Sequence, residues 1–149
     1  MTLFVIVLEI LAILANLAMP IVQSTALRMK AADITREMAK IRAAAESSYG
    51  QTHNWPEDQA PGTSPPELAP YLPPGFTFHH ADYELDWDRW DLAEGKGYGT
   101  GAVFSGVTVV TRDPRLAALV ARELREGETR LTLGNRTTLM IAEPASGEP

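Results

Sequence analysis

Acidic residues alternate along one short segment in the second half of the chain. Asp82, Glu84, Asp86 and Asp88 occupy every second position, and Asp91 follows soon after. Alternate residues of a strand point to the same face, so these carboxylates can converge. Ca²⁺ takes roughly six to eight oxygen ligands, which carboxylates can supply. The pattern therefore predicts a calcium site at Asp86, Asp88 and Asp91, with a solvated acidic strand face as the alternative interpretation.

Other residue types with chemical potential show no pattern of a catalytic site. His79 and His80 are neighbours, and neighbouring strand residues point to opposite faces, which disfavours a shared zinc ion. The serines lack the nucleophile-elbow pattern, and the glycines of residues 95–101 lack the Gly-Lys-Ser/Thr ending of a phosphate loop. We therefore expect no enzymatic activity. Trp87 and Trp90 offer a different function, stacking on a sugar, although such residues more often belong to a core.

Charge and cysteine content exclude further classes of function. Residues 50–149 hold eight basic and fifteen acidic side chains, whereas residues 1–49 hold five basic and four acidic ones. Nucleic-acid binding needs clustered Lys and Arg, so an acidic second part argues against a nucleic-acid partner. The chain has no cysteine, which excludes disulfides, thiol catalysis and cysteine metal sites.

The start of the chain has the composition of a membrane-spanning helix. Residues 3–22 are apolar except for Glu9 and Asn16. Twenty helical residues measure about 30 Å, the thickness of a bilayer core. A secretory signal peptide would have a basic start and a shorter apolar core, and a buried core helix is rarely this uniformly apolar. We therefore expect residues 1–22 to form a transmembrane anchor.

The polar residues of this segment suggest where it contacts other helices. Glu9, Asn16 and Gln23 are seven residues apart and share one helix face. An ionisable group in hydrocarbon costs at least about 2.5 kcal/mol, which favours a partner. We expect Glu9 to meet a positive group of a neighbouring subunit and Asn16 to hydrogen-bond between helices, with Pro20 at the same packing surface. Alternatively, Glu9 is protonated or reaches the membrane surface.

The same helix continues beyond the anchor and becomes amphipathic over residues 23–49. Leu27, Ile34 and Ile41 recur at seven-residue spacing, and Met38 fills an alternate position of the same stripe. These four residues are expected to attach the helix to a globular head, and Gly50 is expected to end the helix.

Turn residues and hydrophobic patterns divide the remaining chain into short elements. Seven prolines within residues 51–75 predict a stiff loop, which holds one short helix started by a capping box at Ser64 and Glu67. We expect a strand over residues 76–87, a glycine-rich loop over 94–101, a strand over 102–111, a helix between Asp113 and Gly127, and a hairpin of strands 130–133 and 137–142. The expected fold class is α+β, a long N-terminal helix packed on a small antiparallel sheet. Its parts are the anchor half (1–22), the amphipathic half (23–49), a globular head (50–142) and a flexible tail (143–149).

This order of elements resembles the type IV pilin family, particularly the pseudopilins of type II secretion. The apolar segment ending at Ala18-Met19-Pro20 is similar to the family's anchor. Trp55-Pro56 resembles the Trp-Pro pair that follows the first helix in pilin-like proteins. The sequence differs from the family at Val5, where the family has glutamate; Glu9 lies one helical turn further on.

The resemblance implies a structural subunit of a pilus or of a type II secretion pseudopilus. Its partners would be other pilin-like subunits, assembly-platform proteins and membrane lipid. It would span the bacterial inner membrane once, with its head in the periplasm or outside the cell, and major pseudopilins hold calcium near a loop of their sheet. Arg28 and Lys30 alone would favour a cytoplasmic head by the positive-inside rule. The competing function is a single-pass anchored module that binds calcium or a glycan.

Overall fold

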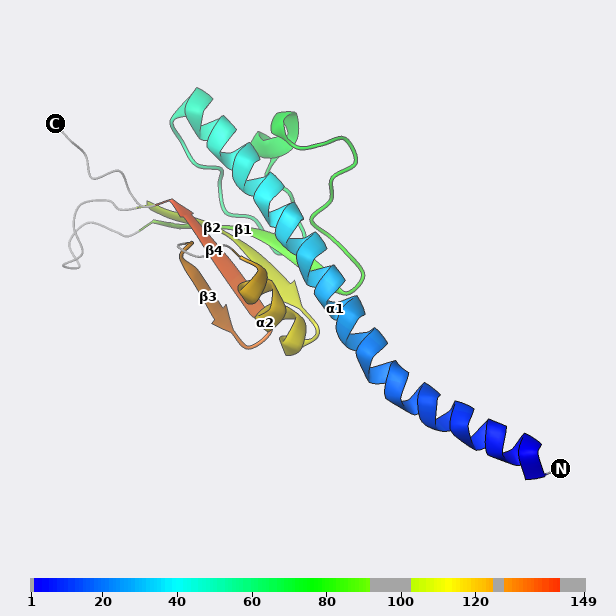
Figure 1. The fold of residues 1–149 in the computed structure, drawn as a ribbon. Coiled ribbons are helices and arrows are strands. Elements are labelled where there is room, and N and C mark those ends of the chain that lie inside the picture. The colour runs from blue at the N-terminus through cyan, green and yellow to red at the C-terminus, as the bar shows by residue number, and fades with distance from the viewer. Residues whose placement is uncertain (1, 92–102, 125–127, 143–149) are drawn as a thin grey trace.

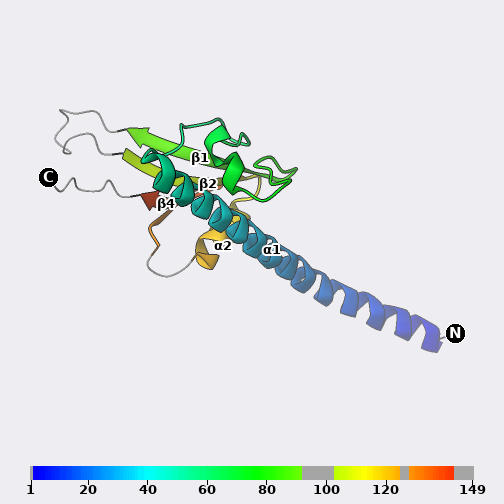
Figure 2. The same cartoon turned by 90° about the horizontal axis from the view of Figure 1, so that it is seen from above.

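One helix runs through the first third of the protein and extends far beyond the rest of it. The computed structural model describes residues 2–91, 103–124 and 128–142. Helix α1 (Thr2–Thr52) has 51 residues, which correspond to about 76 Å of helix at 1.5 Å per residue. Figures 1 and 2 show the second half of α1 lying against the head, while the first half extends away from it. Leu, Ala and Met are frequent along α1, and these good helix formers favour its length.

The C-terminal end of α1 lies three residues beyond the expected one. The prediction that Gly50 ends the helix is wrong, because α1 continues through Gly50 to Thr52. His53 then adopts a left-handed conformation, with φ of 55°, and its N–H donates to the carbonyl of Tyr49 at 2.7 Å. A left-handed residue is the usual way to end a helix, here without glycine. The ring of Tyr49 stacks on Trp55 at 4.4 Å, which stabilises this last turn.

A four-stranded antiparallel sheet forms the body of the head. Its strands are β1 (Tyr83–Asp91), β2 (Val103–Thr111), β3 (Arg130–Leu133) and β4 (Arg136–Ala142), in the order β1-β2-β4-β3. The register places Asp86 opposite Thr108 and Trp87 opposite Val107. The hairpin predicted about Gly134 is confirmed, and Gly134 has the positive φ, 59°, that such a turn requires.

Both helices pack on the same face of the sheet, as Figure 1 shows. Helix α2 (Pro114–Glu123) begins as predicted, with the Asp113 side chain accepting a hydrogen bond from the backbone N–H of Arg115 at 2.9 Å. It ends four residues before Gly127, which lies outside the described residues. The core between the helices and the sheet contains, from α1, α2 and three strands, the side chains of Ile34, Met38, Ile41, Leu85, Trp87, Val107, Val109, Leu116, Val120 and Leu139. The α+β fold class is therefore confirmed.

The proline-rich loop after α1 differs in detail from its prediction. It contains a 3₁₀ helix (Pro66–Tyr71) without a side-chain cap, so the expected capping box at Ser64 and Glu67 is wrong. The strand expected over residues 76–87 begins later than predicted, at Tyr83, the first residue of β1. Phe78 precedes the strand and packs into the core from the loop. The glycine-rich loop and the tail lie outside the described residues.

The same loop covers the free edge of β1. The backbone N–H of Gly62 donates to the carbonyl of Leu85 at 2.9 Å, and that of Gln59 donates to the carbonyl of Trp87 at 3.5 Å. An uncovered edge strand is a template for unwanted pairing, so this loop protects the sheet. It also brings residue 58 to the outer face of β1.

Candidate functional site

The first half of α1, here called the stem (residues 2–22), is an apolar helix whose side chains are exposed over residues 2–19. Its large apolar side chains are about half to three-quarters exposed, from 48% for Val7 to 77% for Leu3. The most apolar 18-residue window of α1 has none of its residues buried within the protein, and its mean hydropathy is 2.5. The stem is therefore one long apolar N-terminal helix that could span a membrane or serve as a signal sequence.

The predicted assembly residues lie on this stem. Glu9 and Asn16 are exposed, and no residue of the apolar window around them is buried against the head. The helix continues through Pro20, whose missing N–H leaves the carbonyl of Asn16 without its usual intrahelical partner. The side chain of Pro20 is outside the described set. The stem thus presents a carboxylate, an amide and a backbone acceptor to whatever surrounds it.

The second half of α1 is fixed to the head by its apolar stripe. Ile34, Met38 and Ile41 are fully buried in the core, and Leu27 is partly buried at its edge. Fully burying a side chain of this size stabilises a fold by about 1.5–3 kcal/mol. The four residues expected to attach the head therefore all lie at the contact between α1 and the head.

Polar contacts add to this attachment on the side of β1. The Tyr83 hydroxyl donates to Glu37 at 2.8 Å, and His80 stacks on the Tyr83 ring at 4.3 Å. Burial, together with Glu37, raises the pKa of the Tyr83 phenol, so it remains a donor. Lys30, about two turns closer to the stem than Glu37, pairs with Asp82. These contacts join the second half of α1 to the start of β1 and the segment before it.

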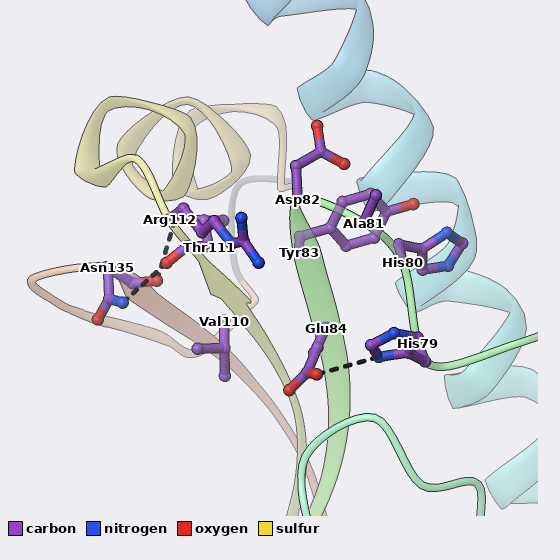
Figure 3. Close-up of a pocket in the computed structure, with 10 residues that line it drawn as sticks. All are labelled: His79, His80, Ala81, Asp82, Tyr83, Glu84, Val110, Thr111, Arg112 and Asn135. Carbon is purple, nitrogen blue, oxygen red and sulfur yellow. Dashed lines mark hydrogen bonds and ion pairs between the residues drawn. The ribbon is translucent and has the colours of Figure 1, made fainter.

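A shallow pocket of about 490 Å³ lies beside these contacts, between the start of β1 and the end of β2. Figure 3 shows His79 directed to Glu84, with Nδ1 and Oε1 3.0 Å apart, and Asn135 donating to the carbonyl of Thr111 at 2.8 Å. His80 instead lies 3.4 Å from Glu37. The two histidines thus have different partners and do not converge on one ion.

Three carboxylates meet on the face of the sheet opposite the helices. Asp58, Asp86 and Asp88, here called the acidic cluster, each offer an oxygen within 4.8 Å of the other two. The Asp88 carboxylate accepts a hydrogen bond of 2.5 Å from Thr108. Asp58 stands on the loop that covers the edge of β1, next to Gln59. The geometry suits a cation bound between a strand and a loop.

Asp86 is the unusual member of the acidic cluster. Its side chain is 3% exposed, and its Oδ1 has no hydrogen-bond partner. Arg136 provides a positive group, with its Nη2 3.6 Å from Oδ2. Burial, with Asp88 next to it, raises the pKa of Asp86 to about 8. An ionised carboxylate buried with an unsatisfied oxygen is costly, so a cation or a proton is needed there at neutral pH.

The structure thus brings together two of the three predicted calcium ligands and adds one that was not predicted. Asp91 is the last residue of β1, and its side chain is not among the described ones. Asp58 lies 28 positions before Asp86, in a loop with no periodicity, so no local pattern relates it to the strand. The only sequence signal is the pair of prolines around it, Pro56 and Pro61, which restrict that loop.

The two tryptophans considered for glycan stacking have different environments. Trp87 is fully buried, and its indole N–H donates to the carbonyl of Pro56 at 2.9 Å. It is therefore a core residue and is not available to a sugar, so this part of the glycan prediction is wrong. Trp90, on the opposite face of β1, is 41% exposed.

The fold and the exposed stem define the class of the protein. A long apolar N-terminal helix, packed through its second half on a four-stranded antiparallel sheet, is a pilin-like architecture. Comparisons with protein-family models, with curated proteins and with solved structures gave no match for this chain.

Proposed function

We propose that this protein is a structural subunit of a pilus or a type II secretion pseudopilus, assembled through its stem. One observation carries the proposal: the stem is apolar and exposed along its whole described length, yet it is continuous with a helical segment that is buried in the core of the head. Such a surface requires lipid or other helices around it. The head gives each copy a folded body that remains outside the bilayer.

The proposed mechanism exchanges lipid for neighbouring stems. Before assembly, the stem of residues 2–22 spans the inner membrane, with the head on its outer side. During assembly, stems of several copies pack together, and the acidic heads form the outer surface of the filament. Lipid is as apolar as the stem, so the gain comes from close packing and from polar contacts between helices. Glu9 and Asn16 are the residues placed to make those contacts.

Overexpression together with an assembly platform tests this function. We expect filaments in sheared cell-surface fractions by electron microscopy, with the protein identified in them by antibody labelling. A chain that inserts into membranes but forms no filament or oligomer under these conditions would contradict the proposal. The anchored binding module would then be the better account.

A second candidate function is cation binding by the head, and the state of Asp86 favours it. We propose that the acidic cluster of Asp58, Asp86 and Asp88 binds a divalent cation, with Ca²⁺ as the natural choice for oxygen ligands. The ion would tie the loop that covers β1 to the sheet. It would also satisfy the buried Oδ1 of Asp86, which has no hydrogen-bond partner among the described residues.

Calcium should therefore stabilise the head, and Asp86→Asn should remove this effect. A ligand at a hundred times its Kd stabilises a folded state by about 2.7 kcal/mol. In a chelator at neutral pH, Asp86→Asn should itself be more stable than the wild type, by about 1–3 kcal/mol. Asp86, with its pKa raised to about 8, must take up a proton on folding, whereas the Asn amide is neutral in both states. Thermal unfolding of the full chain in detergent, with calcium and with chelator, measures both effects.

Asp33→Asn is the matched control, because Asp33 is an exposed acid on α1 whose one ion pair within the described part of the chain is with Arg36. It should leave the calcium response unchanged. A wild-type unfolding temperature that does not respond to calcium, with no heat of binding in calorimetry, would show that Arg136 or a proton satisfies Asp86.

A further inference from the structure

A groove lies between α1 and α2 where α1 leaves the head. Figures 1 and 2 both show α2 beside this part of α1. Its volume is about 460 Å³, and its lining is apolar in the middle with an arginine at either side along α2. The residues that matter are Gln23, Ser24 and Leu27 of α1, and Arg115, Leu119 and Arg122 of α2.

The distance of this groove from the stem along α1 determines where the groove lies relative to a membrane. Gln23 follows the apolar segment directly, and Leu27 lies four residues further on. The residues of α1 that line the groove therefore extend about 7.5 Å beyond Val22 along the helix axis. The polar headgroup layer on each side of a bilayer is about 5–7 Å thick. If the stem crosses the hydrocarbon core, as proposed above, the groove lies at the level of the lipid headgroups.

The charge at this groove is opposite to that of the head. Residues 50–149 have an excess of acidic side chains, yet Arg115 and Arg122 are both exposed here. Arg115 shares its Nε and Nη2 groups with Asp113, at 3.0–3.2 Å. Arg122 has no ion pair with any residue that the structure describes. The acidic neighbour Glu123 lines a separate hollow further along α1.

We propose that this groove binds the headgroup of an anionic phospholipid. Arg122, assisted by Arg115, contacts the phosphate, because the planar guanidinium matches phosphate oxygens. Leu27 and Leu119 receive the glycerol and the upper part of an acyl chain. The inference depends on the proposed membrane span and adds a partner to it: α2 faces the bilayer, and the acidic remainder of the head points away. Each arginine should contribute about a fivefold preference for anionic over neutral lipid.

A fluorescent label in the groove tests this binding on the full chain. The chain has no cysteine, so Ala118→Cys, at a position that lines the groove, gives a single labelling site. The protein is reconstituted in phosphatidylcholine vesicles with and without phosphatidylglycerol, together with a lipid carrying a nitroxide at its headgroup. We expect phosphatidylglycerol to increase the quenching of the label, and we expect high salt or Arg115→Gln/Arg122→Gln to abolish the increase.

Arg36→Gln/Lys40→Gln is the matched control, since it removes the same charge from α1 at least twelve residues beyond Ser24 and should keep the increase. Quenching that is independent of phosphatidylglycerol, or that the control variant also abolishes, would overturn the inference. Quenching that falls as the protein density rises in pure phosphatidylcholine would show that a second copy of the chain covers the groove. This result would overturn the inference as well. Flotation and alkaline extraction of the same vesicles report insertion: an inserted chain without lipid preference removes only this inference, whereas a chain that does not insert removes the proposed span too.

Discussion

Replacing Trp87 with alanine should destabilise the head by about 3–5 kcal/mol, the usual cost of removing a fully buried tryptophan. Trp87 is fully buried in the core, its ring lies 6.2 Å from that of Trp55, and its N–H donates to the carbonyl of Pro56. The variant therefore leaves a cavity and an unpaired buried carbonyl. For a head of about 100 residues, each kcal/mol lowers the unfolding temperature by about 4–8 °C, so we expect a loss of at least about 12 °C. Thermal unfolding in detergent, followed by near-ultraviolet circular dichroism, measures it.

Trp90→Ala is the control for this prediction, because Trp90 belongs to the same strand but is 41% exposed on the opposite face. It should cost less than about 1 kcal/mol, as most surface substitutions do. Equal losses in the two variants would contradict the assignment of Trp87 to the core between the helices and the sheet.

Replacing Glu9 with leucine should prevent assembly while leaving membrane insertion intact. The substitution removes a charge that costs at least about 2.5 kcal/mol in hydrocarbon, so insertion becomes easier. It also removes the contact proposed between stems. Such polar contacts within a membrane are worth about 0.6–2 kcal/mol, which corresponds to roughly 3- to 30-fold in the association constant of each interface. Filament yield by electron microscopy, together with membrane fractionation, reports both effects.

Glu67→Leu makes the same chemical change on an exposed position of the head and should leave filament yield unchanged. Normal filaments from the Glu9→Leu variant would show that Glu9 is protonated or directed to the membrane surface and has no role at the stem contact.

The elements that follow from local patterns could be predicted from the sequence. The prediction of the stem needs only its apolar composition. The prediction of the buried stripe of Ile34, Met38 and Ile41 needs only their helical spacing. Asp113 followed by Pro114 is enough to predict the start of α2, and Gly134 at the turn is enough to predict the β3–β4 hairpin. In each case, neighbours in sequence carry the information, so no knowledge of the tertiary fold was required.

The features that depend on distant contacts could not be predicted. Gly50 remains helical because packing of the last turn of α1, including the stacking of Tyr49 on Trp55, outweighs the cost of a helical glycine. Phe78 enters the core from a loop, although its alternation with Phe76 is typical of a strand. Asp58 reaches Asp86 only because its loop follows the edge of β1. Side chains that meet through such a loop leave no periodic signal.

The central claim is that copies of this protein meet through their stems. Since the chain has no cysteine, single cysteines can be placed at Ile6 and Ile13, which are 49% and 59% exposed on the stem, and at Glu67 on the head. Oxidation in membranes or filaments should give disulfide-linked dimers from Ile6→Cys or Ile13→Cys and none from Glu67→Cys. Dimers from the head position alone, with none at either stem position, would contradict the claim.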